Sequence, residues 1–399
     1  MPRTPSKLKE VDNPFYKKQE EIRGETTEIM NLKLVKNQPH SPEVQPHKVI
    51  GYPINVEELK QLKTIVFGDV SRKIPLSWLN KGYAINRHCK FGFVQKRGGP
   101  CTLLASINAY VFKHLLFSEF ESFDCVELVN DSVPRMLPTE DQVYKAFAYA
   151  LTDILWKCAA ESKIVKVAMY SNLSINIANC DGVSEFMEIY EFERHDELIK
   201  MKDVSDFIML NIECFKGNTV KTSSHAILTT LYSAVLSRGL ININNDIGGN
   251  GPLIDNDELA YGTQSVVNLM LTGVAIIDTF DQFQASELGL KGMQSQSDIG
   301  FLTPIDNMVG QCLQSPKYPI WILHYESHYT VMFKSLENSD IYTYYDMLGL
   351  KESCWEFIMT NDGKVLTLFD ALNDEELNQD TVQLCCLTKW PNLKVEYIE

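Results

Sequence analysis

The sequence predicts an α+β fold, with helices in the first two thirds and an antiparallel sheet late in the chain. Two observations predict it. Apolar residues recur at helical spacing in several segments before residue 275, and β-branched and aromatic residues fill three short segments after residue 318. The periodicity continues from about residue 51 without a low-complexity linker or an internal repeat. The simplest interpretation is one large domain over residues 49–399.

Residues 1–48 differ in composition from the rest of the chain. They hold six of the sixteen prolines, nine Lys or Arg and seven Asp or Glu, but few large apolar side chains. Such a segment buries too little apolar surface to fold, so we expect a flexible N-terminal tail. Its net charge of +2, set against −15 for the whole chain, leaves −17 on residues 49–399.

Composition excludes several classes of protein. The chain is 45% hydrophobic and 22% charged, which is typical of a globular protein. The acidic balance disfavours nucleic acid as a partner and favours a basic protein surface. No segment approaches the roughly 18 consecutive apolar residues of a membrane span, and the first residues lack the apolar core of a signal peptide. We expect a cytoplasmic or nuclear protein that does not enter membranes.

The ten cysteines are spaced irregularly and form no C-x-x-C pair. That spacing argues against a zinc site and against a disulfide framework. Most of them lie in apolar segments and are interpreted as small buried side chains. A cysteine with a distinctive local sequence is therefore conspicuous.

Three helices are expected between residues 139 and 273. In the first, from 139 to about 161, Thr139 and Gln142 have the spacing of a capping box. The second spans about 224–238 and stops at Gly239. The third begins near Gln264 and ends at Gly273, and the apolar segment 274–278 after it is predicted as a strand.

Three further strands are predicted towards the C-terminal end of the sequence. They are the β-branched and aromatic segments PIWILHY, YTVMFK and DIYTYYD, at residues 319–325, 329–334 and 340–346. Their short connections favour antiparallel pairing in the order of the chain.

The segment 91–117 contains the candidate nucleophile. Its apolar residues from Leu103 onward have helical spacing, so a buried helix should begin near Cys101. Gly98 and Gly99 permit a tight turn before it, and Pro100 suits a helix start. A cysteine in the first turn experiences the positive end of the helix dipole and unpaired amides, which favour the thiolate. The alternative is a helix start with an inert buried cysteine.

Gln95 lies six residues before Cys101, across the glycine turn. A turn there can fold the chain back, so that the side-chain amide of Gln95 donates to an oxyanion formed at the thiol. The spacing permits this role without requiring it.

A thiol hydrolase needs an imidazole partner for the thiol. Six of the eight histidines lie in the tail, lack an orienting context or lie more than three turns away on the Cys101 helix: His40, His47, His88, His195, His225 and His114. His324 and His328 remain, flanking the connection between two predicted strands. His328 opens the strand that follows and is the better candidate, because a histidine there can face a helix N-terminus, as in papain-like proteases. The spacing of His324 and His328 would also suit a metal pair, but the sequence offers no evident third ligand, so a metal site is disfavoured.

Asp346 ends the next predicted strand. Adjacent antiparallel strands would bring its carboxylate near His328, where it can fix the imidazole tautomer. An aspartate at a strand end before glycine is equally typical of a plain turn.

Several motifs, in order between about residues 85 and 350, together resemble the MINDY deubiquitinases, closest to the MINDY-3/MINDY-4 branch. They are FGFVQKRGGPC, SAVLSRG, YGTQSVVNLMLTGVA, SDIGFL and PIWILHYESHYTVMF. The family pattern places the catalytic Cys after Gly-Gly-Pro, the oxyanion-stabilising Gln six residues earlier and the catalytic His in a Glu-Ser-His-aromatic motif. This sequence has Cys101, Gln95 and His328 at those positions.

The resemblance implies a papain-like cysteine peptidase fold, ubiquitin and polyubiquitin as partners, and a preference for long K48-linked chains. It implies thiol chemistry in which no metal or organic cofactor takes part. Two residues depart from the expected pattern, namely Thr102 directly after the cysteine and the second histidine, His324. The third catalytic residue varies within the family, so Asp346 is a candidate on structural grounds alone.

The sequence therefore predicts a cysteine-type deubiquitinase that hydrolyses isopeptide bonds in polyubiquitin. Two alternatives belong to other classes. One is a catalytically silent scaffold that binds ubiquitin, and the other is a thiol peptidase or acyltransferase acting on an unrelated protein tail.

Overall fold

A computed structural model describes residues 49–79, 81–95, 98–130, 132–170, 187–194, 198–216, 224–255, 258–282, 291–305, 309–350, 353–361 and 381–397. All of them belong to the unit Val49–Glu399. The tail predicted at residues 1–48 lies outside the described residues.

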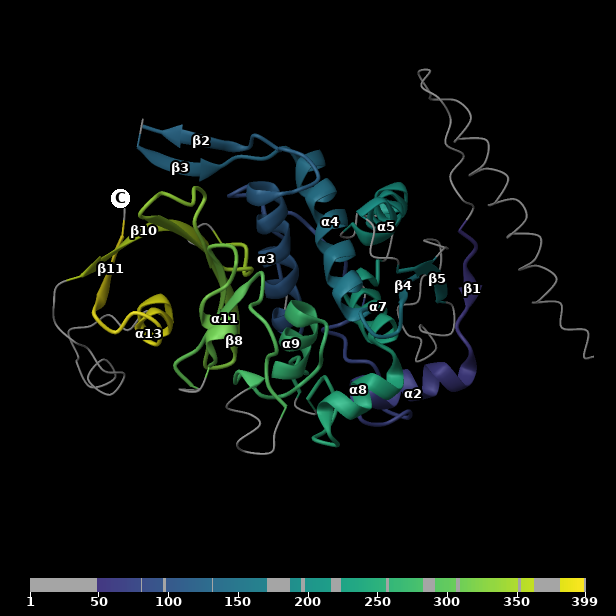
Figure 1. Cartoon of the computed structure of the whole chain (residues 1–399). Coiled ribbons are helices and arrows are strands. Elements are labelled where there is room, and N and C mark those ends of the chain that lie inside the picture. The colour runs from purple at the N-terminus through teal and green to yellow at the C-terminus, as the bar shows by residue number, and fades with distance from the viewer. Residues whose placement is uncertain are drawn as a thin grey trace, which may run out of the picture. The chain divides into compact units, whose positions relative to one another are not determined.

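The described residues mix helices and strands, which confirms the predicted α+β class (Figure 1). The helices are α2 (Val56–Phe67), α3 (Cys101–Phe117), α4 (Glu140–Cys158), α5 (Leu198–Leu210), α6 (Ile212–Phe215), α7 (Ala226–Arg238), α8 (Leu240–Ile247), α9 (Gln264–Thr272), α11 (Gln311–Gln314) and α13 (Thr381–Leu387). The strands are β1 (Tyr52–Pro53), β2 (Val126–Val129), β3 (Val133–Met136), β4 (Ile164–Met169), β5 (Glu188–Glu193), β6 (Gly300–Leu302), β7 (Ile320–Tyr325), β8 (His328–Phe333), β9 (Ile341–Tyr345), β10 (Cys354–Asn361) and β11 (Leu393–Tyr397).

The late sheet has six strands in the order β11-β10-β9-β8-β7-β6. Its neighbours pair antiparallel except β6 and β7, which run parallel. The predicted strands at 319–325, 329–334 and 340–346 correspond to β7, β8 and β9, and they pair in the predicted order. The hairpin end of the sheet, where β7 ends and β8 begins, carries His324 and His328.

The two faces of this sheet belong to different cores, as the alternation of side chains along a strand requires. On β8, Val331 and Phe333 point into the large core shared with the helices. Met332, between them, packs into a smaller cluster with the C-terminal helix α13. The apolar run of β8 is therefore buried on both faces.

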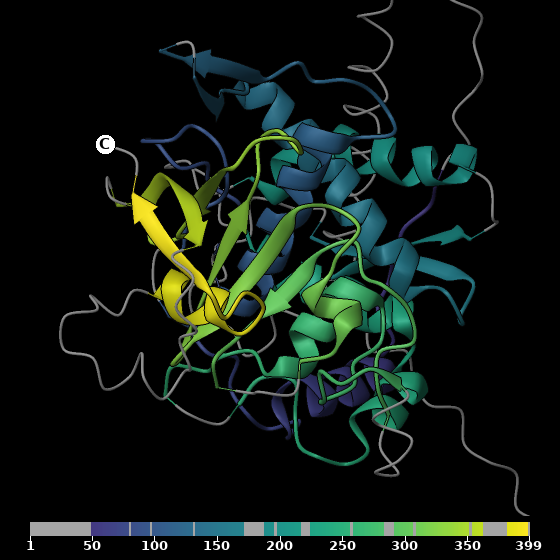
Figure 2. The ribbon, with the colours of Figure 1, turned by 60° about the vertical axis from the view of Figure 1, so that its left-hand side comes forward.

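Helix α3 lies between the six-stranded sheet and α4 (Figure 1). It packs against β7 and β8 on one side and against α4 and α9 on the other. Helix α4 in turn contacts α7, and α7 covers β4 of a separate three-stranded sheet with the order β1-β5-β4. The view in Figure 2 shows the strands of the six-stranded sheet in front of this layer of helices. Because α3 is enclosed on all sides, nearly every residue from Cys101 to Leu115 is buried.

Sequence patterns located the three predicted helices correctly. Helix α4 has the expected capping box, in which the Gln142 N–H donates to Thr139 Oγ1 at 3.3 Å and the Thr139 N–H donates to Gln142 Oε1 at 2.8 Å. Helix α7 ends at Gly239, and α9 ends before Gly273. Among the described residues no single helix is long and apolar enough to cross a bilayer. Helices α7 and α8 reach that length only together, and they are bent by 91°.

The strand predicted at residues 274–278 is wrong, because that segment is irregular. Its backbone groups pair with side chains rather than with a neighbouring strand. Asn268 Nδ2 donates to the carbonyl oxygens of Ile276 and Asp278 at 2.8 and 3.1 Å, and the Ala275 N–H donates to Asp246 Oδ2 at 3.1 Å. These bonds satisfy the groups that a sheet would otherwise have to pair.

A cluster of charges is buried where α3, α4 and the segment before β6 meet. Lys113 Nζ lies 2.6 Å from Asp153 Oδ2 and 3.0 Å from Asp298 Oδ2. Lys157 Nζ lies 3.1 Å from Asp153 Oδ1 and 2.9 Å from Asp298 Oδ2. Burial alone would raise the pKa of Asp298, but attraction to Lys157 and Lys113 outweighs it and holds the pKa well below its ordinary value. Each charge therefore has opposite partners inside the core.

Removing one carboxylate from this cluster should destabilise the fold. Asp298→Asn leaves two buried ammonium groups with fewer partners, and we expect the free energy of unfolding to fall by about 3–5 kcal/mol in urea denaturation at pH 7. The matched control is Glu213→Gln, which removes a carboxylate that is 69% exposed and pairs with Lys216. We expect the control to change the free energy of unfolding by less than about 1 kcal/mol.

The effect of Asp298→Asn should also depend on pH. The pKa of Asp298 in the folded protein lies below its ordinary value of 3.8. The ionised carboxylate of Asp298 therefore stabilises the fold above pH 3.8, and this stabilisation is lost as the pH falls below 3.8 towards the pKa of the folded state. The difference between wild type and variant should be constant down to about pH 4 and shrink at lower pH. A difference that does not change with pH would contradict the ion-pair interpretation.

Candidate active site

Cys101 is the first residue of α3 and is fully buried. Its Sγ atom lies 3.9 Å from the carbonyl oxygen of Ser327 and 4.0 Å from that of Gly99. Ser327 directly precedes β8, so the thiol faces the connection between β7 and β8. The predicted approach of the α3 N-terminus to this edge of the sheet is present.

The glycine turn before Cys101 is tightly enclosed. Gly99 has φ +116°, a conformation that side chains rarely adopt. A Cβ atom at Gly99 would lie 2.6 Å from Ser77 Cβ and 3.1 Å from the Leu259 carbonyl oxygen. Only glycine fits here, and the turn delivers the chain into α3 with the thiol at its first position.

His328 is the first residue of β8 and pairs with Tyr325 across the hairpin. Its Nε2 atom lies 2.9 Å from Asp346 Oδ1. Asp346 directly follows β9, and its own carboxylate is oriented by the Leu348 N–H, which donates to Oδ1 at 3.0 Å. Because β8 and β9 are neighbours, the predicted proximity of Asp346 to His328 is present in the structure.

The surroundings of His328 favour its charged form. Burial alone would lower the pKa of the imidazole, but hydrogen bonds with Asp346 and with Cys101, together with the charges of both, raise it to about 9. Since Nε2 is engaged by Asp346, Nδ1 is the ring nitrogen left for the thiol. At neutral pH this places a positive charge beside Cys101, where a thiol hydrolase needs its imidazole partner.

Gln95 lies beside the turn after β9 and is 6% exposed. Its backbone N–H donates to the Met347 carbonyl oxygen at 2.6 Å, one residue beyond Asp346. Its Oε1 atom is buried without a hydrogen-bond partner in the described part of the chain. The structure thus brings Cys101, His328 and Asp346 into contact and places Gln95 next to Asp346.

The two departures from the expected pattern are structural. Burial lowers the pKa of His324 to about 4, and its ring stacks on Tyr329 with centroids 4.2 Å apart. Thr102 is fully buried against Gly262. Among the described residues no group of three or more His, Cys, Asp or Glu side chains is arranged to hold a metal ion.

The backbone contacts at this site could not be predicted from the sequence. The carbonyl groups of Ser327 and Met347 contact Cys101 and Gln95, and their positions follow from a hairpin and a turn rather than from residue type. The buried amide of Asn108, on an otherwise apolar face of α3, was not predicted to have a role at the site, although a polar residue among apolar ones in the sequence could have indicated it.

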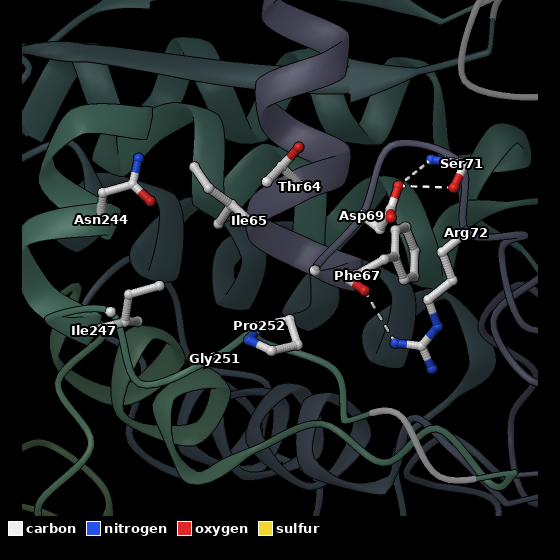
Figure 3. A pocket seen from close by; sticks show the side chains of 12 residues that line it. Thr64, Ile65, Phe67, Asp69, Ser71, Arg72, Asn244, Ile247, Gly251 and Pro252 are labelled. Carbon is white, nitrogen blue, oxygen red and sulfur yellow. Dashed lines mark hydrogen bonds between the residues drawn. The ribbon is translucent and has the colours of Figure 1, made fainter.

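A pocket of about 530 Å³ lies between α2 and the loop after α8 (Figure 3). Thr64 lines it from α2 and Pro252 from the loop. The guanidinium of Arg72 donates to the carbonyl oxygens of Phe67 at 3.1 Å and of Asp255 at 2.7 Å, so it holds the loops together. None of the four candidate site residues lines this pocket.

A thiol at a helix N-terminus, an imidazole and a carboxylate in contact are the groups of a cysteine-hydrolase site. The family model described as "Deubiquitinating enzyme MINDY-3/4, conserved domain" matches residues 63–399. The chain therefore belongs to the MINDY-3/4 deubiquitinating enzyme family, and all four candidate site residues lie within the matched region.

Individual relatives agree with this assignment. The "Probable ubiquitin carboxyl-terminal hydrolase MINDY-4" of Mus musculus is 28% identical over 390 residues, covering 89% of this chain and 48% of that protein. The protein of the same name from Homo sapiens is 28% identical over 391 residues, covering 89% and 47%. "Ubiquitin carboxyl-terminal hydrolase MINDY-3" of Mus musculus is 30% identical over 295 residues, covering 69% and 65%. The chain spans about half the length of the MINDY-4 relatives. No solved structure matches it.

The raised pKa of His328 should depend on Asp346. In Asp346→Asn the carboxylate charge is lost, and we expect the pKa of His328 to fall from about 9 towards or below its ordinary value of 6.5. An NMR titration of the imidazole measures it, with the resonance assigned by its loss in His328→Gln. Asp340→Asn, which changes an exposed aspartate just before β9, is the control and should leave the titration unchanged.

The same shift fixes the sign of a stability effect. A pKa that is raised in the folded state stabilises the protein below the ordinary value of 6.5, and this contribution is lost as the pH rises through about 9. Wild type should therefore exceed Asp346→Asn in stability most at pH 6 and least above pH 9. The opposite order would show that the imidazole is not charged in the folded protein.

Filling the glycine turn should displace the thiol of Cys101. We expect Gly99→Ala to slow alkylation of Cys101 by iodoacetamide by about tenfold or more, because the Cβ atom forces the turn away from Ser77. Gly249→Ala is the matched control, since Gly249 also has positive φ but has nothing within 4 Å of the added atom. The control should keep the wild-type alkylation rate, and equal slowing in both variants would contradict the prediction.

Proposed function

We propose that this chain is a thiol-dependent deubiquitinase in which Cys101 is the nucleophile, His328 the general acid and base, Asp346 the orienting carboxylate and Gln95 an oxyanion donor. One observation carries the proposal. The buried thiol at the start of α3 meets an imidazole whose other nitrogen lies 2.9 Å from a carboxylate. The relatives named as ubiquitin carboxyl-terminal hydrolases support it and supply the substrate class.

The proposed reaction proceeds in two stages. The Cys101 thiolate adds to the carbonyl carbon of an isopeptide bond, and the new oxyanion accepts hydrogen bonds from the Gln95 amide and from backbone N–H groups at the start of α3. The intermediate collapses as His328 gives its proton to the departing lysine amine. Water then attacks the thioester with His328 as base, which releases the carboxylate and restores the thiol.

The contacts of the site suit these steps. An imidazolium near neutral pH is the form that can protonate an amine leaving group. Asp346 holds one ring nitrogen, so the other keeps its orientation towards the thiol. A ubiquitin tail that ends in Gly-Gly has no side chains next to the scissile bond, so the proposal expects a narrow groove leading to Cys101 that rejects bulkier sequences.

Exposed leucines next to the site support binding of an apolar segment ahead of that tail. Leu259 is 52% exposed and lies beside the glycine turn before Cys101. Leu348 is 50% exposed and follows Asp346 by two residues. Specificity would then come from contacts with the body of ubiquitin and from contacts at these two leucines, because the scissile residues lack side chains.

The finer parts of the proposal rest on the family resemblance. A preference for K48-linked chains and a papain-like arrangement of helix and sheet are properties of the family that the motifs around Cys101 and His328 suggest. The packing of α3 on an antiparallel sheet that carries His328 supports the second of them.

A ubiquitin probe with a C-terminal electrophile tests the assignment of the nucleophile. Wild type should be labelled, and Cys101→Ala should lose all labelling while still binding polyubiquitin. Cys312→Ala removes a partly exposed thiol outside the site and should be labelled like wild type. Labelling that persists in Cys101→Ala would refute the proposed nucleophile.

Defined chains of each linkage, incubated with the wild-type chain, separate the alternatives. Cleavage that is strongest for K48 chains supports the full proposal. Binding of chains without labelling or cleavage would favour the silent scaffold, and indifference to every ubiquitin substrate would favour a peptidase of another protein tail.

A further inference from the structure

Gln95 is held through its own backbone N–H, which donates to Met347, and through the hydrogen bonds of the residues before it. It lies at the end of the irregular segment 91–95, which forms one isolated bridge, between Ile85 and Phe93, and belongs to no helix or sheet. An oxyanion donor must be held to within a fraction of an ångström to act, so something outside the segment has to fix it.

One buried side-chain amide, that of Asn108, pairs with both backbone groups of Phe93. The neighbouring residues are paired through the backbone, since the Val94 N–H donates to the Ala84 carbonyl oxygen and the Asn86 N–H donates to the Gly92 carbonyl oxygen, both at 2.9 Å. Asn108 Oδ1 accepts the Phe93 N–H at 2.7 Å, and Asn108 Nδ2 donates to the Phe93 carbonyl oxygen at 3.0 Å. Asn108 is fully buried on α3, seven residues after Cys101. Seven residues are close to two turns, so both side chains leave the same face of the helix.

A second bond ties the same residue to the strand that precedes Asp346. The hydroxyl of Tyr345, a fully buried residue at the end of β9, donates to the Phe93 carbonyl oxygen at 3.1 Å. The Tyr345 ring lies against Gly92, where a Cβ atom would come within 2.5 Å of it and where φ is +68°. Phe93 is therefore fixed at once to the helix that carries Cys101 and to the strand that leads to Asp346.

We infer that Asn108 is a positioning residue, because its amide clamps both backbone groups of Phe93 to α3 and thereby sets where Gln95 stands relative to Cys101. This inference rests on the proposed role of Gln95 as oxyanion donor. Gln95 is two residues beyond the clamp, and its own N–H is held by Met347. Losing the Asn108 amide removes the hydrogen bonds that tie this segment to α3, while the bonds of Phe93 with Tyr345 and of Val94 with Ala84 remain. Gln95 then keeps its links to β9 and to residue 84 but loses the link through Phe93 to the helix that carries Cys101.

A double-mutant cycle between Asn108 and Gln95 tests the inference, with turnover of ubiquitin carrying a fluorogenic C-terminal amide as the measurement. Gln95→Ala should lower kcat about 100- to 1,000-fold. Asn108→Leu should lower kcat on the order of 10- to 100-fold with KM unchanged. The double variant should be no slower than Gln95→Ala alone, because Asn108 acts through Gln95.

The rate of alkylation by iodoacetamide separates a loss of the oxyanion donor from general structural damage. Alkylation forms no oxyanion, whereas general damage around α3 would slow it. The Asn108→Leu variant should therefore be alkylated at Cys101 at the wild-type rate. Asn268→Leu is the matched control, since Asn268 is equally buried and also binds backbone carbonyl groups, at residues 276–278. It should destabilise the fold similarly, keep kcat, and combine additively with Gln95→Ala.

The outcomes are distinguishable. If Gln95→Ala keeps full kcat, the proposed oxyanion role fails. If Gln95→Ala loses kcat but the effects of Gln95→Ala and Asn108→Leu multiply, or if Asn108→Leu slows alkylation as much as turnover, the positioning role is refuted. Should Asn108→Leu not fold, Tyr345→Phe removes one bond to Phe93 while keeping the ring, and its smaller loss of kcat must vanish in the Gln95→Ala background.

Discussion

The contact between the thiol of Cys101 and the imidazole of His328 is the constraint on which the rest of the structure depends. The two residues are far apart in sequence, and each opens a regular element, one α3 and the other β8. They meet because α3 packs across β7 and β8 with its N-terminus at the hairpin end of those strands. Residues that set the depth, direction or start of α3 therefore act on the reactive groups as well.

Three residues of helix α3, at its start, in its middle and near its end, make buried polar contacts with neighbouring segments. Cys101 at its start faces the Ser327 carbonyl, Asn108 in its middle binds Phe93, and Lys113 near its end pairs with buried carboxylates. Apolar packing alone leaves a helix free to slide or rotate by small amounts at modest cost. A buried hydrogen bond or ion pair does not, since a shift leaves the group desolvated without a partner. The buried polar groups of α3 thus fix the register of the helix against its neighbours.

The sequence revealed those parts of the site whose positions depend on local rules. The glycine turn, the start of the helix at Cys101 and the strand beginning at His328 all have short-range patterns, and the adjacency of Asp346 follows from antiparallel order. The strand expected at 274–278 failed because Asn268, a single side chain, pairs the backbone that the pattern assigned to a sheet. The parallel pairing of β6 with β7 has no local pattern at all. The fold class and the thiol, imidazole and carboxylate could therefore be predicted, whereas long-range side-chain to backbone pairing could not.

The residues proposed as catalytic differ in the same way, since some are placed by local patterns and others by long-range pairing. Cys101 and His328 stand on a helix and a strand whose hydrogen bonds are internal, so their positions are determined by the fold. Gln95 stands on an irregular segment, and its backbone must be paired by groups from elsewhere. The Met347 carbonyl oxygen accepts the Gln95 N–H, and Asn108 and Tyr345 pair the backbone groups of Phe93, two residues earlier. Asn108 and Tyr345 belong to the elements that carry Cys101 and lead to Asp346. These bonds link Gln95, the proposed oxyanion donor, through Phe93 and Met347 to the elements that carry the thiol and the carboxylate. For that reason a buried asparagine, which an apolar residue could replace in volume, has a physical reason to be in the core of α3.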